Sequence, residues 1–182
     1  AWLGRDIAKS SRKEVQPLRQ ELQIVFQDPL ASLDPRTTIG QSISEPLTVF
    51  RPDVDAKGKE AAAREMMERM GLDPAMVNRY PHELSGGQNQ RVGIARAMIL
   101  RPKLVVCDEA VSALDVSVQA QILDLLIGLQ KEFGLAMMFI SHDLSVVREI
   151  CHRVMVLYLG RVVEMASRDE LFANPRHPYT RA

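Results

Sequence analysis

Polar side chains that can hold metal ions or move protons stand directly after three apolar segments of the chain. Gln27 follows the apolar run that ends at residue 26, Asp108 and Glu109 follow residues 104–107, and His142 follows residues 136–140. Apolar runs of this length are typical of buried strands, and open α/β sheets bind ligands at the carboxyl ends of their strands. The sequence therefore predicts a site at one edge of a mainly parallel sheet.

A second candidate site is the pentapeptide Leu84–Gln88, LSGGQ. A helix is expected from about Gly87 to Leu100, so Ser85, Gly86 and Gly87 place bare backbone amides at a helix N-terminus, which attracts anions. Glycines let the backbone approach a phosphate closely, and the serine adds a hydroxyl donor.

Each feature has an ordinary structural explanation when it is taken alone. Gln27 could be a loop amide, and His142 could lie at the solvent edge. The pair Asp108-Glu109 could cap a helix, and LSGGQ could be a turn. The order and spacing of all four, with the segment SALD at residues 112–115, argue against coincidence.

Taken in this order, the motifs resemble those of ABC-type ATPases, proteins that close two nucleotide-binding domains around ATP. The resemblance runs from Leu22 to the end of the chain and identifies LSGGQ as the signature motif. Two details depart from the commonest pattern: Asn89 stands where Arg is frequent, and Ala110-Val111 stand where Pro-Thr is frequent. Neither change removes a catalytic group.

The resemblance implies a role for each motif residue. Gln27 would be the Q-loop glutamine, which senses the γ-phosphate and Mg²⁺ and faces the membrane partner. Asp108 would hold Mg²⁺ and Glu109 would polarise the attacking water. His142 would be the switch histidine on the γ-phosphate. The residues expected to contact ATP across the dimer interface belong to the signature and the D-loop: Ser85, Gly86, Gly87, Gln88, Ser112, Ala113, Leu114 and Asp115.

A Walker A loop, G-x-x-x-x-G-K-[ST], is missing from the sequence. The pair Gly58-Lys59 has Asp53 at the first glycine position and Glu60 in place of Ser or Thr. We therefore expect that residue 1 is not the native start, and that this chain lacks ATPase activity by itself. The missing strand should neighbour residues 104–107, so that its loss leaves unpaired strand edges and exposed apolar surface.

The expected fold class is α/β, a P-loop NTPase-like ABC ATPase core with a mainly parallel sheet and an inserted all-helical subdomain. We expect one partial ABC ATPase domain over residues 1–182, a helical signature subdomain over about 40–100, and the start of a C-terminal extension over about 167–182. The predicted strands are Glu21–Phe26, Leu104–Cys107, Ala136–Ile140 and a hairpin of Val154–Tyr158 and Arg161–Met165. The predicted helices are Lys57–Met70, Gly87–Leu100, Val116–Phe133 and one that ends near Ile150, and residues 30–37 are predicted to be a loop.

Composition sets further limits. With 46% apolar residues the chain can supply a core, and its 23 basic and 23 acidic residues give no sign of a bulk nucleic-acid or anionic-lipid binder. Cys107 and Cys151 have neither metal nor disulfide spacing, so both are expected to be buried free thiols. Apolar stretches such as Leu135–Ile140 are too short to cross a bilayer.

Three further segments point to a subfamily. VFQDP at Val25–Pro29 and SLDPR at Ser32–Arg36 look like the Q-loop region of oligopeptide and dipeptide importer ATPases. NPRHPYT at Asn174–Thr180 is similar to the start of the C-terminal extension in this subfamily, which includes nickel and glutathione importers. A proline-rich linker is the simpler explanation of that segment on physical grounds alone. The cargo (peptide, opine, metal or glutathione) stays open.

The resemblance implies an ATP-binding and hydrolysing subunit, using ATP and Mg²⁺, that powers import of peptides or related small solutes. Expected partners are a second ATP-binding subunit, identical or different, the membrane-spanning permease subunits and, indirectly, an extracytoplasmic solute-binding protein; no nucleic acid is expected. The expected location is the cytoplasmic face of a bacterial inner membrane, as a peripheral protein. Two alternatives remain: a soluble ABC ATPase in DNA repair or translation, or a non-hydrolysing interaction module if Ala1 is the true start.

Overall fold

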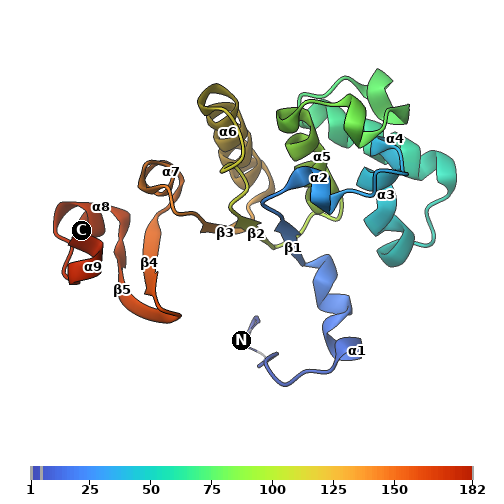
Figure 1. The fold of residues 1–182 in the computed structure, drawn as a ribbon. Coiled ribbons are helices and arrows are strands. Elements are labelled where there is room, and N and C mark those ends of the chain that lie inside the picture. Colours follow the sequence, from blue (N-terminus) through green and yellow to red (C-terminus); the bar gives the residue numbers. More distant parts are fainter. Residues whose placement is uncertain (1, 5, 182) are drawn as a thin grey trace. The chain divides into compact units, whose positions relative to one another are not determined.

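The computed structural model describes residues 2–4 and 6–181, and the chain divides into two compact units. The first unit runs from residue 1 to Ile140 and the second from Ser141 to residue 182. Figure 1 shows the elements of both units in sequence colours. Each unit is described by itself below.

The first unit is built on a three-stranded parallel sheet. Its strands, in order across the sheet, are β1 (Leu22–Val25), β2 (Leu104–Asp108) and β3 (Ala136–Ile140). Ile24 lies opposite Val106, and Val106 lies opposite Met138. Both edges of β2 are therefore paired, and the prediction that another strand neighbours residues 104–107 is wrong. In this sheet only the outer edges of β1 and β3 could accept a further strand.

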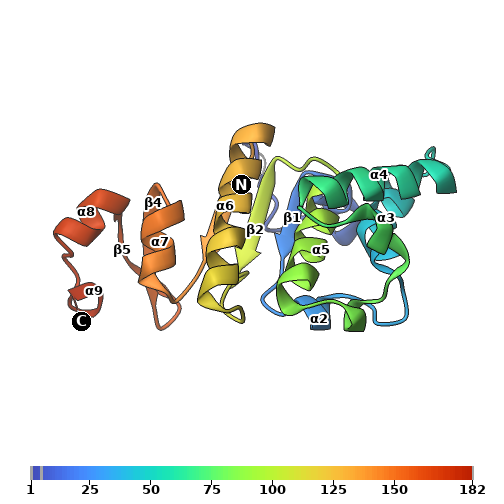
Figure 2. The same cartoon turned by 90° about the horizontal axis from the view of Figure 1, so that it is seen from above.

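Two long helices, α5 (Gly86–Met98) and α6 (Val116–Phe133), lie on the same side of the sheet (Figures 1 and 2). Because strand side chains alternate between faces, Val25, Val105 and Cys107 are buried, whereas several neighbours on the opposite face are exposed. The exposed apolar side chains of that face, called the open face below, are Ile24, Phe26, Met138 and Ile140. The prediction of strands buried on both faces is therefore wrong for the described chain.

The region between β1 and β2 is helical from residue 39 to residue 98. It contains α3 (Ile39–Phe50), α4 (Ala56–Arg69), the 3₁₀ turns η2 (Pro74–Asn78) and η3 (Pro81–Glu83), and α5. Three methionines at the C-terminal end of α4 belong to the core, since Met66, Met67 and the C-cap Met70 are buried. Gly71, which follows the C-cap of α4, has a φ of 68°, as expected for a glycine beyond a helix C-terminus.

Three short helical elements surround β1: α1 (Arg12–Val15), η1 (Pro17–Gln20) and α2 (Pro29–Ser32). The last of these lies where a loop was predicted. Asp28 caps it, because its Oδ1 accepts hydrogen bonds from the backbone N–H groups of Leu30 and Ala31, and Pro29 suits the first helical position. Pro29, four residues after the end of β1, therefore starts a helix.

Helix α6 matches its predicted bounds and differs in its inner stripe. The apolar spacing predicts an inner stripe of Ile122, Leu125, Leu126, Leu129 and Phe133. Ile122, Leu126 and Leu129 are buried, whereas Leu125 and Phe133 are half-buried and Leu123 is buried. The buried face is thus rotated toward Leu123. Helix α6 packs against α5, a tertiary contact that no single-helix pattern contains.

The second unit holds α7 (Leu144–Ile150), the antiparallel hairpin β4 (Arg153–Tyr158) and β5 (Arg161–Ser167), α8 (Arg168–Ala173) and α9 (Pro178–Arg181). Leu159 and Gly160 form the predicted tight turn, with φ values of 48° and 74°. Two successive positive φ angles are typical of a type I′ hairpin.

Both cysteines are free thiols. Cys107 is buried and its desolvation raises its pKa to about 12, which fits a packing role. Cys151 is half-buried, not fully buried as expected, and burial also raises its pKa. Over residues 2–4 and 6–181, no helix is long and apolar enough to span a membrane.

Candidate functional site

Two of the predicted site residues meet at the ends of neighbouring strands. Gln27, which follows β1, donates a hydrogen bond from its side-chain nitrogen Nε2 to Oε2 of Glu109, which follows β2, at 2.8 Å. The two residues are separated by 82 positions in the sequence. The parallel register of β1 and β2 is what places them side by side, as predicted for groups at one sheet edge.

The backbone of Glu109 is also held in an unusual conformation. Its φ is 47°, in the left-handed region that residues other than glycine seldom adopt, at a cost of roughly 1–3 kcal/mol. Its N–H donates to the carbonyl of Ile140 at the end of β3, at 3.0 Å. The main chain of Glu109 is therefore hydrogen-bonded to β3, and its side chain is hydrogen-bonded to Gln27, which follows β1.

Asp108 is the last residue of β2 and is half-buried beside this contact. In the described part of the chain, no three His, Cys, Asp or Glu residues are grouped so that they could hold a metal ion by themselves. Mg²⁺ suits such a site because it usually binds through one or two carboxylates, keeps several waters and takes its other ligands from phosphates. Asp108, with the side-chain oxygen of Gln27, fits this partial ligand set.

The signature motif forms a capped helix start. Ser85 is the N-cap of α5, and its hydroxyl accepts the N–H of Gln88 at 3.3 Å. The side-chain oxygen of Gln88 accepts the N–H of Ser85 in return, at 2.9 Å. This reciprocal pair is a capping box, so Gln88 holds the motif in shape through its side chain.

The two signature glycines have different surroundings. A Cβ atom on Gly86 would lie 3.8 Å from Cδ2 of Leu114, an ordinary contact distance. A Cβ atom on Gly87 would lie only 2.5 Å from Cγ1 of Val118, where no side chain fits without movement. Both glycines were expected to let a phosphate approach the backbone. The absence of a side chain at Gly87 also leaves room for the first turn of α6 in the same chain.

The predicted D-loop lies between Glu109 and α6. The hydroxyl and the N–H of Ser112 both donate to the carbonyl of Glu109, at 3.0 and 3.1 Å. Ala113 is exposed, Leu114 is half-buried, and Asp115 is the N-cap of α6. The loop is therefore anchored on Glu109 at one end and lies beside the signature, through Leu114 and Gly86, at the other.

The last predicted site residue, His142, belongs to the second unit. It is exposed and precedes α7, whose N-cap Asp143 accepts the N–H of Ser145 at 2.8 Å. His142 thus lies at the solvent edge, next to the cap of α7, and its predicted role on the γ-phosphate stays a prediction.

Arg96 connects the segment that follows Gln27 to the signature helix. Its guanidinium, carried by α5, donates to the backbone carbonyl of Ser32 at the end of α2, at 2.7 Å. Burial lowers the pKa of Arg96, and the nearby charge of Glu45 opposes that shift. Sequence patterns did not identify this link, because its acceptor is a backbone carbonyl that any residue could supply.

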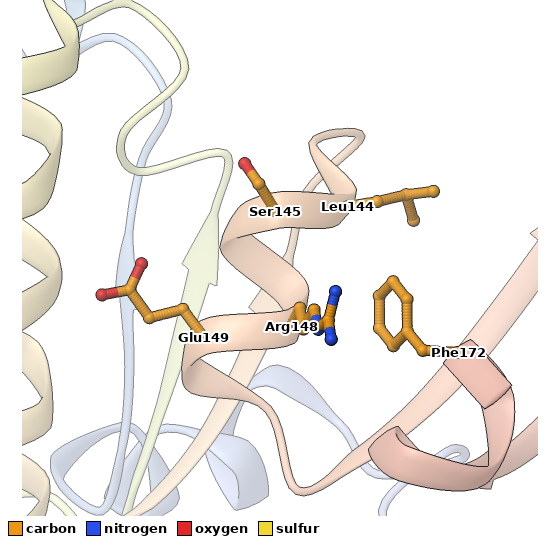
Figure 3. Close-up of a pocket in the computed structure, with 5 residues that line it drawn as sticks. All are labelled: Leu144, Ser145, Arg148, Glu149 and Phe172. Carbon is orange, nitrogen blue, oxygen red and sulfur yellow. The ribbon is translucent and has the colours of Figure 1, made fainter.

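A separate hollow lies on the second unit between α7 and α8, lined by Leu144, Ser145, Arg148, Glu149 and Phe172 (Figure 3). The guanidinium carbon of Arg148 stands 5.7 Å from the centre of the Phe172 ring, a cation–π contact. None of the predicted nucleotide-binding residues lines this hollow. It is distinct from the candidate site.

Comparison with known families identifies the fold and the motifs together. The family model described as ABC transporter matches residues 1–112, which include Gln27, the LSGGQ segment and the pair Asp108-Glu109. The chain belongs to the ABC transporter family. It is 54% identical over 182 residues to the oligopeptide transport ATP-binding protein OppF of Salmonella typhimurium, covering all of this chain and 54% of that protein. It is 56% identical over 180 residues to the glutathione import ATP-binding protein GsiA of Escherichia coli K12, covering 98% of this chain and 28% of that protein.

Solved structures show the same fold. CbiO1 from Clostridium perfringens, part of an ABC transporter complex, superposes with a TM-score of 0.78 at 30% identity, over 90% of this chain and 64% of that one. A dimeric ATP-binding cassette in a post-hydrolysis state, bound to ADP and phosphate, gives a TM-score of 0.77 at 29% identity, over 88% of this chain and 68% of that one. The α/β ABC ATPase fold predicted from the motifs is thus confirmed. The chain spans about half the length of OppF, and about a quarter of GsiA.

Proposed function

We propose that the chain is the larger part of the ATP-hydrolysing domain of an importer subunit, which powers uptake of peptides or related small solutes. The observation that carries this proposal is the pair formed by Gln27 and Glu109 at the carboxyl edge of the parallel sheet, beside Asp108. An amide and two carboxylates at this edge can orient water and help to hold Mg²⁺ for hydrolysis of the phosphoanhydride bond of ATP.

In this proposal each residue acts through a definite atom. Asp108 would hold Mg²⁺ with its carboxylate, and the side-chain oxygen of Gln27 would be a further ligand. The carboxylate of Glu109 polarises the attacking water, and His142 contacts the γ-phosphate. Mg²⁺, when bound, neutralises charge on the phosphate oxygens.

The dimer supplies the remaining contacts. The N-terminus of α5, with Ser85, Gly86 and Gly87, offers amide and hydroxyl donors to the ATP of a second subunit, identical or different. Gln88 keeps that turn in shape, and the D-loop residues 112–115 lie at the subunit interface. The phosphate cradle and its lysine must come from a Walker A segment, which residues 1–182 do not contain. The complete subunit below means a polypeptide that carries residues 1–182 together with such a segment.

The relatives support transport over the alternative of a soluble repair or translation factor, since OppF and GsiA are named for oligopeptide transport and glutathione import. The proposed partners are permease subunits in the membrane and, indirectly, a solute-binding protein, and the proposed location is the cytoplasmic face of the membrane. Peptide-stimulated ATP hydrolysis after reconstitution with the permease would test this coupling.

The test of hydrolysis is the substitution Glu109→Gln in the complete subunit. The amide cannot polarise water as a carboxylate does, so turnover should fall by roughly 10²- to 10⁴-fold while ATP still binds. Asp124→Asn, a change of an exposed carboxylate on α6, is the matched control and should leave the rate unchanged. Parental turnover in Glu109→Gln would exclude Glu109 as the catalytic carboxylate.

A further inference from the structure

Asn89 is a buried polar residue directly after the signature motif. Its side chain is 0% exposed, although it lies in the first turns of a helix whose N-cap, Ser85, is exposed. Asn89 is also one of the residues at which the sequence departs from the commonest family pattern. Its contacts show what the side chain does there.

The side-chain nitrogen of Asn89 donates two hydrogen bonds, both toward the segment that leads into the helix. It lies 2.9 Å from the carbonyl oxygen of Pro81 and 3.4 Å from that of Leu84. The Pro81 carbonyl also accepts the N–H of Leu84, at 3.2 Å. Asn89 thus joins the 3₁₀ turn η3 and the residue before the N-cap to the body of α5.

The contact with Leu84 bears on the signature itself. The carbonyl of Leu84 and the N–H of Ser85 belong to one rigid peptide plane. Asn89 approaches the oxygen side of that plane, and the side-chain oxygen of Gln88 binds its N–H side at 2.9 Å. The orientation of this plane sets where the Ser85 hydroxyl and the amides of Gly86 and Gly87 point.

Asn89 is not the residue that stability alone would favour. Its Oδ1 atom is buried and accepts no hydrogen bond from any described residue. A buried polar atom without a partner destabilises a fold by roughly 1–3 kcal/mol, and an apolar side chain of similar size avoids that penalty. Asn89 therefore contributes more through the positions of the Pro81 and Leu84 carbonyls, which its side-chain nitrogen fixes, than through stability.

We propose that Asn89 is a positioning residue for the signature motif: it fixes the peptide plane that orients Ser85, Gly86 and Gly87 toward the nucleotide of the opposite subunit. The proposal rests on the function proposed above. Asn89 acts through the Leu84 carbonyl and does not touch the nucleotide.

The test compares Asn89→Leu with Gln90→Ala in the complete subunit. Leucine has a similar volume, removes the unpaired Oδ1 and cannot donate, so the variant should stay folded and unfold within a few degrees of the parent. Gln90 is the adjacent buried amide on the same helix, and its Nε2 donates to no described residue, which makes it the matched control. Asn89→Ala is measured as well, in case leucine does not fit.

The expected result separates binding from turnover. Asn89→Leu should bind ATP with an affinity within about twofold of the parent, while kcat and ATP-driven dimer formation fall by roughly 10- to 100-fold, because small displacements of positioned groups have effects of this size. Gln90→Ala should keep both. Parental kcat in a folded Asn89→Leu or Asn89→Ala variant, or an equal loss in Gln90→Ala, would overturn the proposal. Parental turnover in Glu109→Gln would instead overturn the proposed function, so the two failures are distinguishable.

Discussion

The Gln27 side chain donates to the Glu109 carboxylate at 2.8 Å, and this bond joins the residues that follow two neighbouring parallel strands. Glu109 is held at its backbone as well, by the bond from its N–H to Ile140. The candidate catalytic carboxylate therefore has its position set by three strand ends. A carboxylate that polarises water must have a fixed orientation, and these hydrogen bonds fix the orientation of Glu109.

The substitution Gln27→Glu should make turnover of the complete subunit depend on pH. Two carboxylates at hydrogen-bond distance repel each other and share a proton. The shared proton occupies the carboxylate of Glu109, which then cannot accept a hydrogen bond from the attacking water. Turnover should fall by roughly tenfold or more at pH 6 and recover in part by pH 8.5, when the shared proton is lost. Steady-state ATPase assays over this range measure the effect. Gln27→Ala, which adds no carboxylate, should lose activity without the recovery, and identical pH profiles for the two variants would contradict this explanation.

The two signature glycines should respond differently to alanine. In a helix, alanine is intrinsically better than glycine by about 1 kcal/mol, so Gly86→Ala should leave the free energy of unfolding unchanged or slightly higher. Gly87→Ala should lower it, because the new Cβ meets Val118 at 2.5 Å and overpacking costs roughly 1–3 kcal/mol. Denaturant unfolding of the complete subunit measures both changes.

The partner side chain offers a direct check of this packing. Val118→Ala removes the methyl group that the Gly87 Cβ would meet, so the double variant should recover most of the stability lost in Gly87→Ala. Simple additivity of the two single changes would mean that the contact with Val118 does not limit residue 87.

Sequence patterns predicted the elements that local chemistry determines. Val116–Phe133 and Ala136–Ile140 have the predicted bounds. The helix is determined by the spacing of its apolar residues and by Gly134 at its C-terminus, both of which are local features of the sequence. The family motifs also placed Gln27 and Glu109 in one site, and the structure brings them into contact.

The errors came from tertiary relationships. An apolar strand shows that its side chains can be buried, yet only the structure shows that Met138 and Ile140 lie on the open face. Strand order is also absent from local sequence, so the pairing of β2 with β3 was missed. The burial of Asn89 could not be predicted, because it lies in the polar run Gln88-Asn89-Gln90-Arg91 and nothing local shows that its side chain is buried.

The C-terminal segment NPRHPYT should behave as a docked element and not as a linker. Glu164 on β5 accepts the backbone N–H groups of Arg176 and His177 at 2.8 and 3.0 Å, and the Tyr158 and Tyr179 rings pack 4.5 Å apart. Glu164→Ala should expose these amides, so their hydrogen exchange at pH 7 should accelerate. Glu170→Ala, which removes only the exposed ion pair with Arg176, is the control and should leave the exchange nearly unchanged.

The same contact gives a pH dependence with a definite sign. The N–H of Arg176 first, then the nearby Thr180 hydroxyl and the N–H of His177, lower the pKa of Glu164 to about 2, below the usual value of 4.5. A carboxylate with a lowered pKa in the folded state stabilises above its unfolded pKa, and its contribution is lost as pH falls. The difference in stability between parent and Glu164→Ala should therefore be constant above about pH 4.5 and shrink toward zero near pH 2. A difference that stayed constant down to pH 2 would contradict the assignment.

Residues 1–182 expressed alone should neither hydrolyse ATP appreciably nor bind Mg-ATP at micromolar concentrations. They lack the lysine and the amide cradle that hold the β- and γ-phosphates, and the signature serves the nucleotide of another subunit. Calorimetric titration with Mg-ATP measures the affinity, and ATP hydrolysis is assayed on the same sample. Micromolar affinity in a monodisperse sample would show that these residues suffice for binding.

The same isolated chain should also aggregate through the open face, where the side chains of Phe26, Met138 and Ile140 are between 42% and 50% exposed. Exposed apolar patches next to unpaired strand edges promote association, so light scattering should rise with concentration. Met138→Lys places a charge on this face and should reduce scattering while the circular dichroism spectrum is kept. Val105→Lys, on the covered face and 1% exposed, should instead unfold the chain, because it buries an unpaired charge. Equal scattering from the parent and Met138→Lys would exclude the open face as the cause of association.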